Sequence, residues 1–68
     1  MNRINYYRNK TKTSFGVLAK LTGLSSTYIY FIAAGKRNNP SKEVMEKISE
    51  ALGKSVNEVF YPSAKEAS

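Results

Sequence analysis

Residues 15–35 read FGVLAKLTGLSSTYIYFIAAG, and this stretch decides the fold. Its apolar residues recur at helical spacing on both sides of a tight turn. The turn contains Gly23, a residue type that readily takes the left-handed conformation at the end of a helix. Ser25 is a favourable N-cap for the helix that follows. The stretch therefore predicts two consecutive helices, over residues 15–22 and 26–34, joined by a short turn.

The flanking sequence predicts three more helices and no strands. The first runs over residues 3–10, and the fourth is capped by Ser41 and ends near Leu52. Ser55 and Glu58 have the spacing of a capping box, which begins a short fifth helix. The predicted fold class is therefore all-α, a compact five-helix bundle in which the second and third helices form a helix-turn-helix.

The chain has 68 residues, the size of one small domain. We expect this domain to span residues 1–62, followed by a flexible tail over residues 63–68. No apolar run approaches the roughly 20 residues that cross a bilayer. The N-terminus leads into no apolar signal segment. These features predict a cytoplasmic protein without membrane contact.

The residue types that are absent disfavour several function classes. The chain contains no Cys and no His, so it has neither a disulfide framework nor the usual ligands of a zinc site. A Ser-His-Asp or Cys-His catalytic arrangement cannot be assembled without histidine. We therefore predict that the protein is not an enzyme and holds no metal or cofactor. The sequence also gives no sign of a small-molecule ligand.

Charge is distributed unevenly along the chain. The 11 Lys and Arg residues against five acidic residues, all Glu, give a net charge of +6. Residues 1–42 contain eight basic residues and no acidic one, a charge of +8. Residues 43–68 contain three Lys against five Glu, a charge of −2, and the two parts sum to +6. A basic half of this kind predicts a polyanion facing the N-terminal part of the molecule.

Several short motifs occur in register over residues 3–60. They are Leu18-Ala19, Thr22-Gly23-Leu24-Ser25, Tyr28-Ile29, Ile32, Gly35-Lys36-Arg37-Asn38, Pro40-Ser41, Ile48, Ala51-Leu52-Gly53 and Ser55-Val56-Asn57-Glu58-Val59-Phe60. In this combination the chain resembles the Cro/CI-type (XRE-like) helix-turn-helix repressors. The resemblance implies a lambda-repressor-like DNA-binding fold. It also implies a transcriptional regulator, a repressor in the leading interpretation, that binds specific sequences of double-stranded DNA.

The same resemblance implies how DNA is bound, with the helix over residues 26–34 entering the major groove. The candidate base contacts are Ser26, Thr27, Tyr30 and Phe31. The candidate phosphate contacts lie on both flanks of this helix. Before it are Ser14 and the amide of Phe15, at the start of the preceding helix. After it are Lys36, Arg37 and Asn38, and Arg8 and Lys12 complete the set. For Arg8 an equal alternative is that it closes the helix bundle.

Two features depart from the family pattern. Phe15 stands where the family often has a glutamine, and the recognition helix carries Tyr30 and Phe31 in place of long polar side chains. A helical wheel places both rings away from the apolar face. Three interpretations follow: contact with DNA, such as thymine methyl groups, a protein interface, or a rotated helix with Phe31 partly buried. The alternative function is a protein-interaction module that binds another regulator through these exposed aromatics.

The C-terminal end of the predicted bundle is apolar. Val56, Phe60 and Tyr61 are the candidate residues of a dimer interface, although Val56 also suits the core. A twofold homodimer would place two recognition helices about 34 Å apart, the spacing of half-sites in a palindromic operator. It would also bury apolar area that a domain of this size lacks. We therefore expect a homodimer on a palindromic operator.

Overall fold

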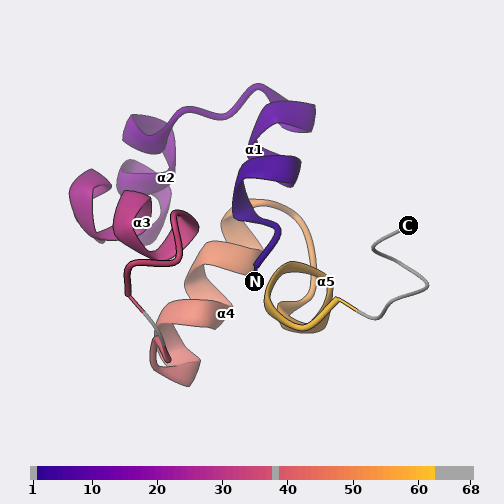
Figure 1. The fold of residues 1–68 in the computed structure, drawn as a ribbon. Coiled ribbons are helices and arrows are strands. Elements are labelled where there is room, and N and C mark those ends of the chain that lie inside the picture. The colour runs from indigo at the N-terminus through magenta and orange to yellow at the C-terminus, as the bar shows by residue number, and fades with distance from the viewer. Residues whose placement is uncertain (1, 38, 63–68) are drawn as a thin grey trace.

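The structure, a computed structural model, describes residues 2–37 and 39–62 (Figure 1). Within them the chain forms five helices and no strands, which confirms the predicted all-α bundle. The helices are α1 (Ile4–Thr11), α2 (Phe15–Thr22), α3 (Ser26–Ala33), α4 (Lys42–Ala51) and α5 (Val56–Phe60). The predicted tail over residues 63–68 and the predicted phosphate contact Asn38 lie outside the described residues.

Four serine side chains begin four of these helices. Each serine Oγ accepts a hydrogen bond from the amide three residues later, at 3.1–3.2 Å. The four N-caps are Ser14, Ser25, Ser41 and Ser55. At α5 the cap is reciprocal, because Glu58 Oε1 accepts from the Ser55 amide at 3.0 Å. The predicted caps and the predicted capping box are confirmed.

The bounds of α2 are those predicted, whereas α1, α3 and α4 differ from the predicted bounds by one residue. The first helix covers Ile4–Thr11 where residues 3–10 were expected, because its C-cap is Lys12 in the left-handed region, with φ of 55°. Its N–H donates to the carbonyls of Arg8 and Asn9. The α3 helix ends at Ala33 and α4 at Ala51, since Ala34 and Leu52 act as C-caps. Shifts of this size arise where helix ends fray.

The turn between α2 and α3 spans residues 23–25 and changes the chain direction by 113°. This angle lies within the range of helix-turn-helix units, which is about 90–120°. Gly23 has φ of +77°, the conformation that glycine was expected to provide. The buried hydroxyl of Thr22 donates to the Leu18 carbonyl at 2.7 Å and accepts from the Leu24 amide at 3.1 Å. These bonds fix the turn from inside.

One apolar core holds the helices together. Helix α3 packs on α2, α2 on α4, and α5 on both α4 and α1. The buried residues of this core are Ile4, Tyr7, Leu18, Ile29, Ile32, Ala33, Ile48, Leu52 and Val59. Each of the five helices contributes at least one of these buried residues, so packing as well as helix propensity stabilises each helix.

No single helix in residues 2–37 and 39–62 has the length and apolar character to cross a membrane. The bent pair of α2 and α3, taken as one segment, has the length and the apolar composition of a membrane span. Residues Leu18 and Ile29 of this pair lie fully buried in the core.

Candidate nucleic-acid interface

Helix α3 divides its side chains between the core and the surface. Ile29 and Ile32 are buried, whereas Tyr30 is 47% exposed and Phe31 38% exposed. Ser26 and Thr27, at the N-terminal end of the helix, are also exposed. The helix is therefore oriented as the wheel predicts, and its aromatic side chains are presented outward next to the two candidate base contacts of its first turn.

Three aromatic rings form a continuous row across α2 and α3, which we call the aromatic row: Phe15, Tyr30 and Phe31. The ring centroids of Phe15 and Tyr30 lie 5.7 Å apart with planes at 83°, an edge-to-face contact. The Tyr30 and Phe31 centroids lie 5.9 Å apart at 51°. The row spans the two helices of the motif, so it couples the start of α2 to the exposed side of α3.

Arg8 joins this row to α1. Its guanidinium carbon lies 4.1 Å from the centroid of the Phe15 ring. Its Nε donates to Asn5 Oδ1 at 3.1 Å, and its Nη1 donates to the Thr13 carbonyl at 3.3 Å. Arg8 thus links α1 to the segment that precedes α2, as the bundle-closing alternative expects. Its contact with phosphate stays a prediction.

The N-terminus of α2 provides amides next to the aromatic row. The Ser14 hydroxyl accepts from the Val17 amide at 3.1 Å, which occupies it as an acceptor and leaves its proton available for donation. The amides of Phe15 and Gly16 belong to the first turn, where an α-helix has no intrahelical acceptors. The helix dipole adds positive potential at this point. The geometry suits an anion such as a phosphate.

The loop after α3 folds back onto that helix. The amides of Lys36 and Arg37 both donate to the Phe31 carbonyl, at 2.9 and 3.2 Å. Gly35 permits this reversal with φ of +77°. Both basic side chains are exposed, and the Arg37 guanidinium carbon lies 5.3 Å from the centroid of the Tyr28 ring. Two cations therefore follow the C-terminal end of α3.

A shallow hollow of about 510 Å³ lies between α3 and this loop, and we call it the α3 hollow. Its lining residues are Thr27, Tyr28, Phe31, Lys36 and Arg37. Two aromatic rings and the threonine line it, with the two basic residues of the loop beside them. The hollow is thus mainly apolar and is flanked by positive charge.

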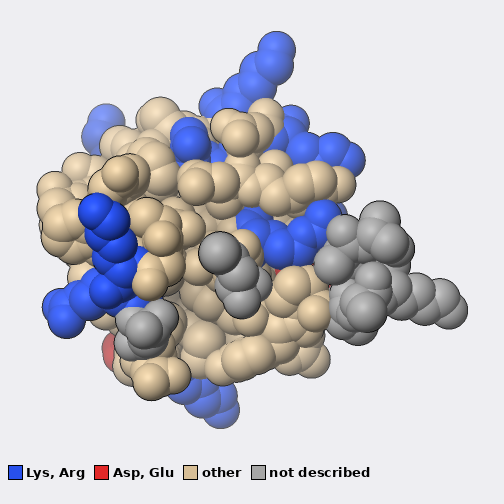
Figure 2. Space-filling view, viewed as in Figure 1, with Lys and Arg blue, Asp and Glu red and all other residues tan. Residues whose placement is uncertain are grey.

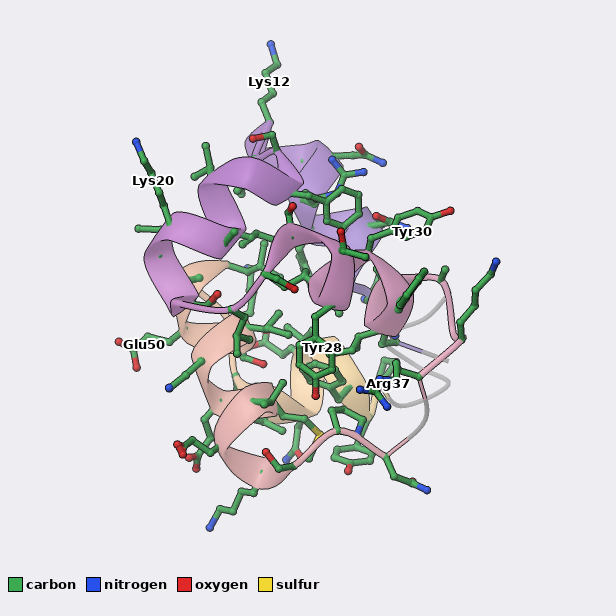
Figure 3. All side chains as sticks on the ribbon, turned by 90° about the vertical axis from the view of Figure 1, so that its left-hand side faces the viewer. Lys12, Lys20, Tyr28, Tyr30, Arg37 and Glu50 are labelled. Carbon is green, nitrogen blue, oxygen red and sulfur yellow. The ribbon has the colours of Figure 1, made fainter. Side chains whose placement is uncertain are left out.

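Basic side chains surround the exposed side of α2 and α3. Figure 3 shows Lys12, Lys20 and Arg37 around these helices, with Glu50 on the side of the view away from Tyr30. On the adjoining face drawn in Figure 2, Lys and Arg are seen at several places and acidic residues are almost out of view. This surface matches the basic N-terminal half of the sequence.

The comparison with known families agrees with this geometry. A family model described as helix-turn-helix matches residues 4–59, from the first residue of α1 to the penultimate residue of α5. The chain belongs to the Cro/CI-type helix-turn-helix family. This is a family of DNA-binding transcription regulators, and α2 and α3 form the helix-turn-helix of this chain. A search of curated proteins found no match.

The three candidate residues of a dimer interface differ in exposure, and their role in dimerisation stays a prediction. Tyr61 is 62% exposed, and its hydroxyl donates to Met45 Sδ at 3.5 Å. Phe60 is half-buried against the core, and Val56 is partly buried in α5. Phe60 and Tyr61 share a groove with Met45 and Arg37. The surface proposed for dimerisation therefore centres on Tyr61.

Two contacts near the candidate DNA interface were not predicted from the sequence, those of the Asn2 side chain and of the Phe15 ring. Asn2 donates from Nδ2 to the Ile32 carbonyl at 2.8 Å and accepts from the Ile4 amide at 3.0 Å. It therefore fixes the N-terminus of α1 against α3. The sequence pointed to Phe15 for its amide alone, yet the Phe15 ring contacts the Tyr30 ring. An apolar residue after the Ser14 cap was the only signal for that contact.

Proposed function

We propose that this protein is a sequence-specific regulator of transcription that inserts α3 into the major groove of double-stranded DNA. The observation that carries the proposal is the arrangement around α3. Its exposed face carries Tyr30, which contacts Phe15 at the start of α2, and the cations of Lys36 and Arg37 follow its C-terminal end. Phosphate contacts from the start of α2 and from this loop would hold α3 in a groove.

In this complex the base contacts are Ser26, Thr27, Tyr30 and Phe31. The phosphate contacts are Ser14, the Phe15 amide, Lys36, Arg37 and Asn38, with Arg8 and Lys12 beside them. Residues 1–62 form the DNA-binding domain. The recognition helix has few groups for bidentate hydrogen bonding, so the backbone contacts supply a large part of the affinity.

The proposed active form is a cytoplasmic homodimer on a palindromic operator. Tyr61 and Phe60, with Val56, would form the interface, because an exposed ring beside a groove offers apolar area to a second copy. Dimerisation would place two copies of α3 about one DNA turn apart. A bound dimer acts most simply as a repressor, by covering DNA that another protein needs.

A second candidate is a protein-interaction module that binds another regulator. The observation that favours it is the exposure of Tyr30 and Phe31, since tyrosine and phenylalanine are enriched in protein interfaces. The basic loop beside α3 and the positive surface around it favour DNA instead.

Selection of duplexes from a random library tests the two candidates. A regulator should bind the selected sequence at least about a thousandfold more tightly than random duplex at physiological salt. Equal affinity for both would contradict sequence-specific regulation. Tyr30→Ala then separates the candidates, because failure to capture a partner protein together with unchanged DNA affinity would favour the interaction module.

A further inference from the structure

The recognition helix has an unusual chemical character. Residues 26–33, STYIYFIA, contain no Arg, Lys, Asn, Gln, Asp or Glu. The helix therefore offers no guanidinium or carboxamide that could form a bidentate contact with guanine or adenine. Its exposed groups are the hydroxyls of Ser26, Thr27 and Tyr30 and the apolar surface of Thr27 and Phe31. Any readout by this helix has to use those groups.

We infer that α3 recognises thymine through its 5-methyl group, which enters the α3 hollow against Phe31 and Thr27. This inference rests on the proposed function and specifies the DNA that the same site selects. Thymine is the base that presents a methyl group in the major groove, and apolar side chains contact that methyl. The operator half-site would then carry A·T pairs where Phe31 and Thr27 meet the bases.

The position of the two side chains supports this assignment. Thr27 and Phe31 are four residues apart, so they lie one above the other on the same exposed side of α3. Both line the α3 hollow together with Tyr28, which is partly buried against the core. A methyl group placed there would meet carbon atoms of the protein and leave water. Burial of one such group is favourable by the ordinary hydrophobic effect.

The aromatic row limits the freedom of the reading side chains. Tyr30 is held between Phe15 and Phe31 by ring contacts of 5.7 and 5.9 Å. Phe31 also has its carbonyl fixed by the amides of Lys36 and Arg37. The ring contact with Tyr30 restricts the Phe31 side chain before DNA binds, so binding costs less side-chain entropy. The same two loop residues place positive charge where the strand beside the hollow carries its phosphates.

Removal of the methyl group from DNA tests the inference directly. Each thymine of the selected operator is replaced singly by uracil, which keeps the hydrogen-bonding groups and lacks only the methyl. At the positions that contact Phe31 and Thr27, uracil should weaken binding about fourfold per methyl, the effect of exposing one methyl-sized apolar group. Exchange of that T·A pair for C·G should weaken binding too, and 5-methylcytosine should recover about the same factor.

Protein variants assign the effect to the hollow. In Phe31→Ala, where Thr27 still lines the hollow, the thymine-to-uracil affinity ratio at the sensitive position should fall toward one. Phe31→Leu keeps apolar surface at the site and should keep the preference for thymine. The control is Tyr6→Ala, which removes an exposed aromatic ring from α1 and should leave the thymine-to-uracil ratio as in the wild type. Circular dichroism confirms that each variant is helical.

The outcomes separate the inference from the proposed function. If no duplex is selected over random DNA, sequence-specific regulation fails and the inference fails with it. If a duplex is selected but uracil is tolerated at every thymine, the inference is overturned and the regulator stands. If a sensitive thymine exists but its thymine-to-uracil affinity ratio in Phe31→Ala equals that of the wild type, the assignment to this hollow is overturned.

Discussion

The ring of Phe15, at the start of α2, packs edge-on against the ring of Tyr30 in α3, with centroids 5.7 Å apart and planes at 83°. The contact joins the two helices of the motif at the edge of the core, because Phe15 is partly buried against the core and Tyr30 is 47% exposed. Arg8 covers Phe15 with its guanidinium 4.1 Å from the ring centroid. The orientation of α3 therefore depends on a surface contact as well as on buried Ile29 and Ile32.

A double-mutant cycle between Phe15→Ala and Tyr30→Ala measures this contact. We expect a coupling free energy of about 1 kcal/mol, the usual contribution of an aromatic pair beyond the area it buries. Urea unfolding of the wild type, both single variants and the double variant gives the value. Additive changes, within about 0.3 kcal/mol, would show that the two rings do not stabilise one another.

The salt dependence of DNA binding reports on Lys36. Lys36→Ala should weaken binding to every duplex alike. It should also flatten the plot of log K against log salt by about 0.9 for each phosphate that the variant no longer neutralises. The control is Lys47→Ala, because Lys47 lies on α4, outside the candidate DNA interface, where its Nζ is 3.9 Å from Glu43 Oε1. An equal change of slope in both variants would contradict a phosphate contact by Lys36.

The helices and their caps could be predicted because their determinants are local. Ser14, Ser25, Ser41 and Ser55 each bond an amide three residues away, so the sequence alone places them. The left-handed conformation at Gly23 likewise depends on that residue. The helical wheel of α3 also indicated which side faces the core, since the period of the helix sets it.

The contacts that orient the recognition helix could not be predicted in the same way. The predicted helix-turn-helix implied an angle of about 90–120° between α2 and α3, but it did not indicate that the rings of Phe15 and Tyr30 would meet across the observed 113°. The bond from Asn2 to the Ile32 carbonyl joins residues 30 positions apart. For Arg8 the sequence left contact with phosphate and closure of the helix bundle as equal alternatives. Only the structure shows its contacts with Asn5 and Phe15.

Ser49 in α4 offers a route to a more stable protein. It is 1% exposed, and within the described residues its Oγ has no hydrogen-bond partner. An unsatisfied buried hydroxyl is destabilising, so Ser49→Ala should raise the free energy of unfolding by roughly 1 kcal/mol. Ser55→Ala is the matched control, because removal of that N-cap should lower the free energy of unfolding by about 1 kcal/mol. A decrease in stability in Ser49→Ala would contradict the buried, unpaired hydroxyl.

The capping box of α5 makes stability depend on acid pH. The Ser55 backbone N–H donates to the Glu58 carboxylate at 3.0 Å, and this bond, helped by the charge of Lys54, holds the pKa of Glu58 below its ordinary value. A carboxyl whose pKa is lower in the folded state stabilises the fold above its unfolded pKa, and this stabilisation is lost as pH falls through the folded pKa. Glu58→Gln should therefore be less stable than the wild type at pH 7. The gap should close on acidification below the usual glutamate pKa, roughly pH 4. Urea unfolding of both proteins from neutral to acid pH measures the gap, and a difference that stays constant would show that the ionised carboxylate has no part in the cap.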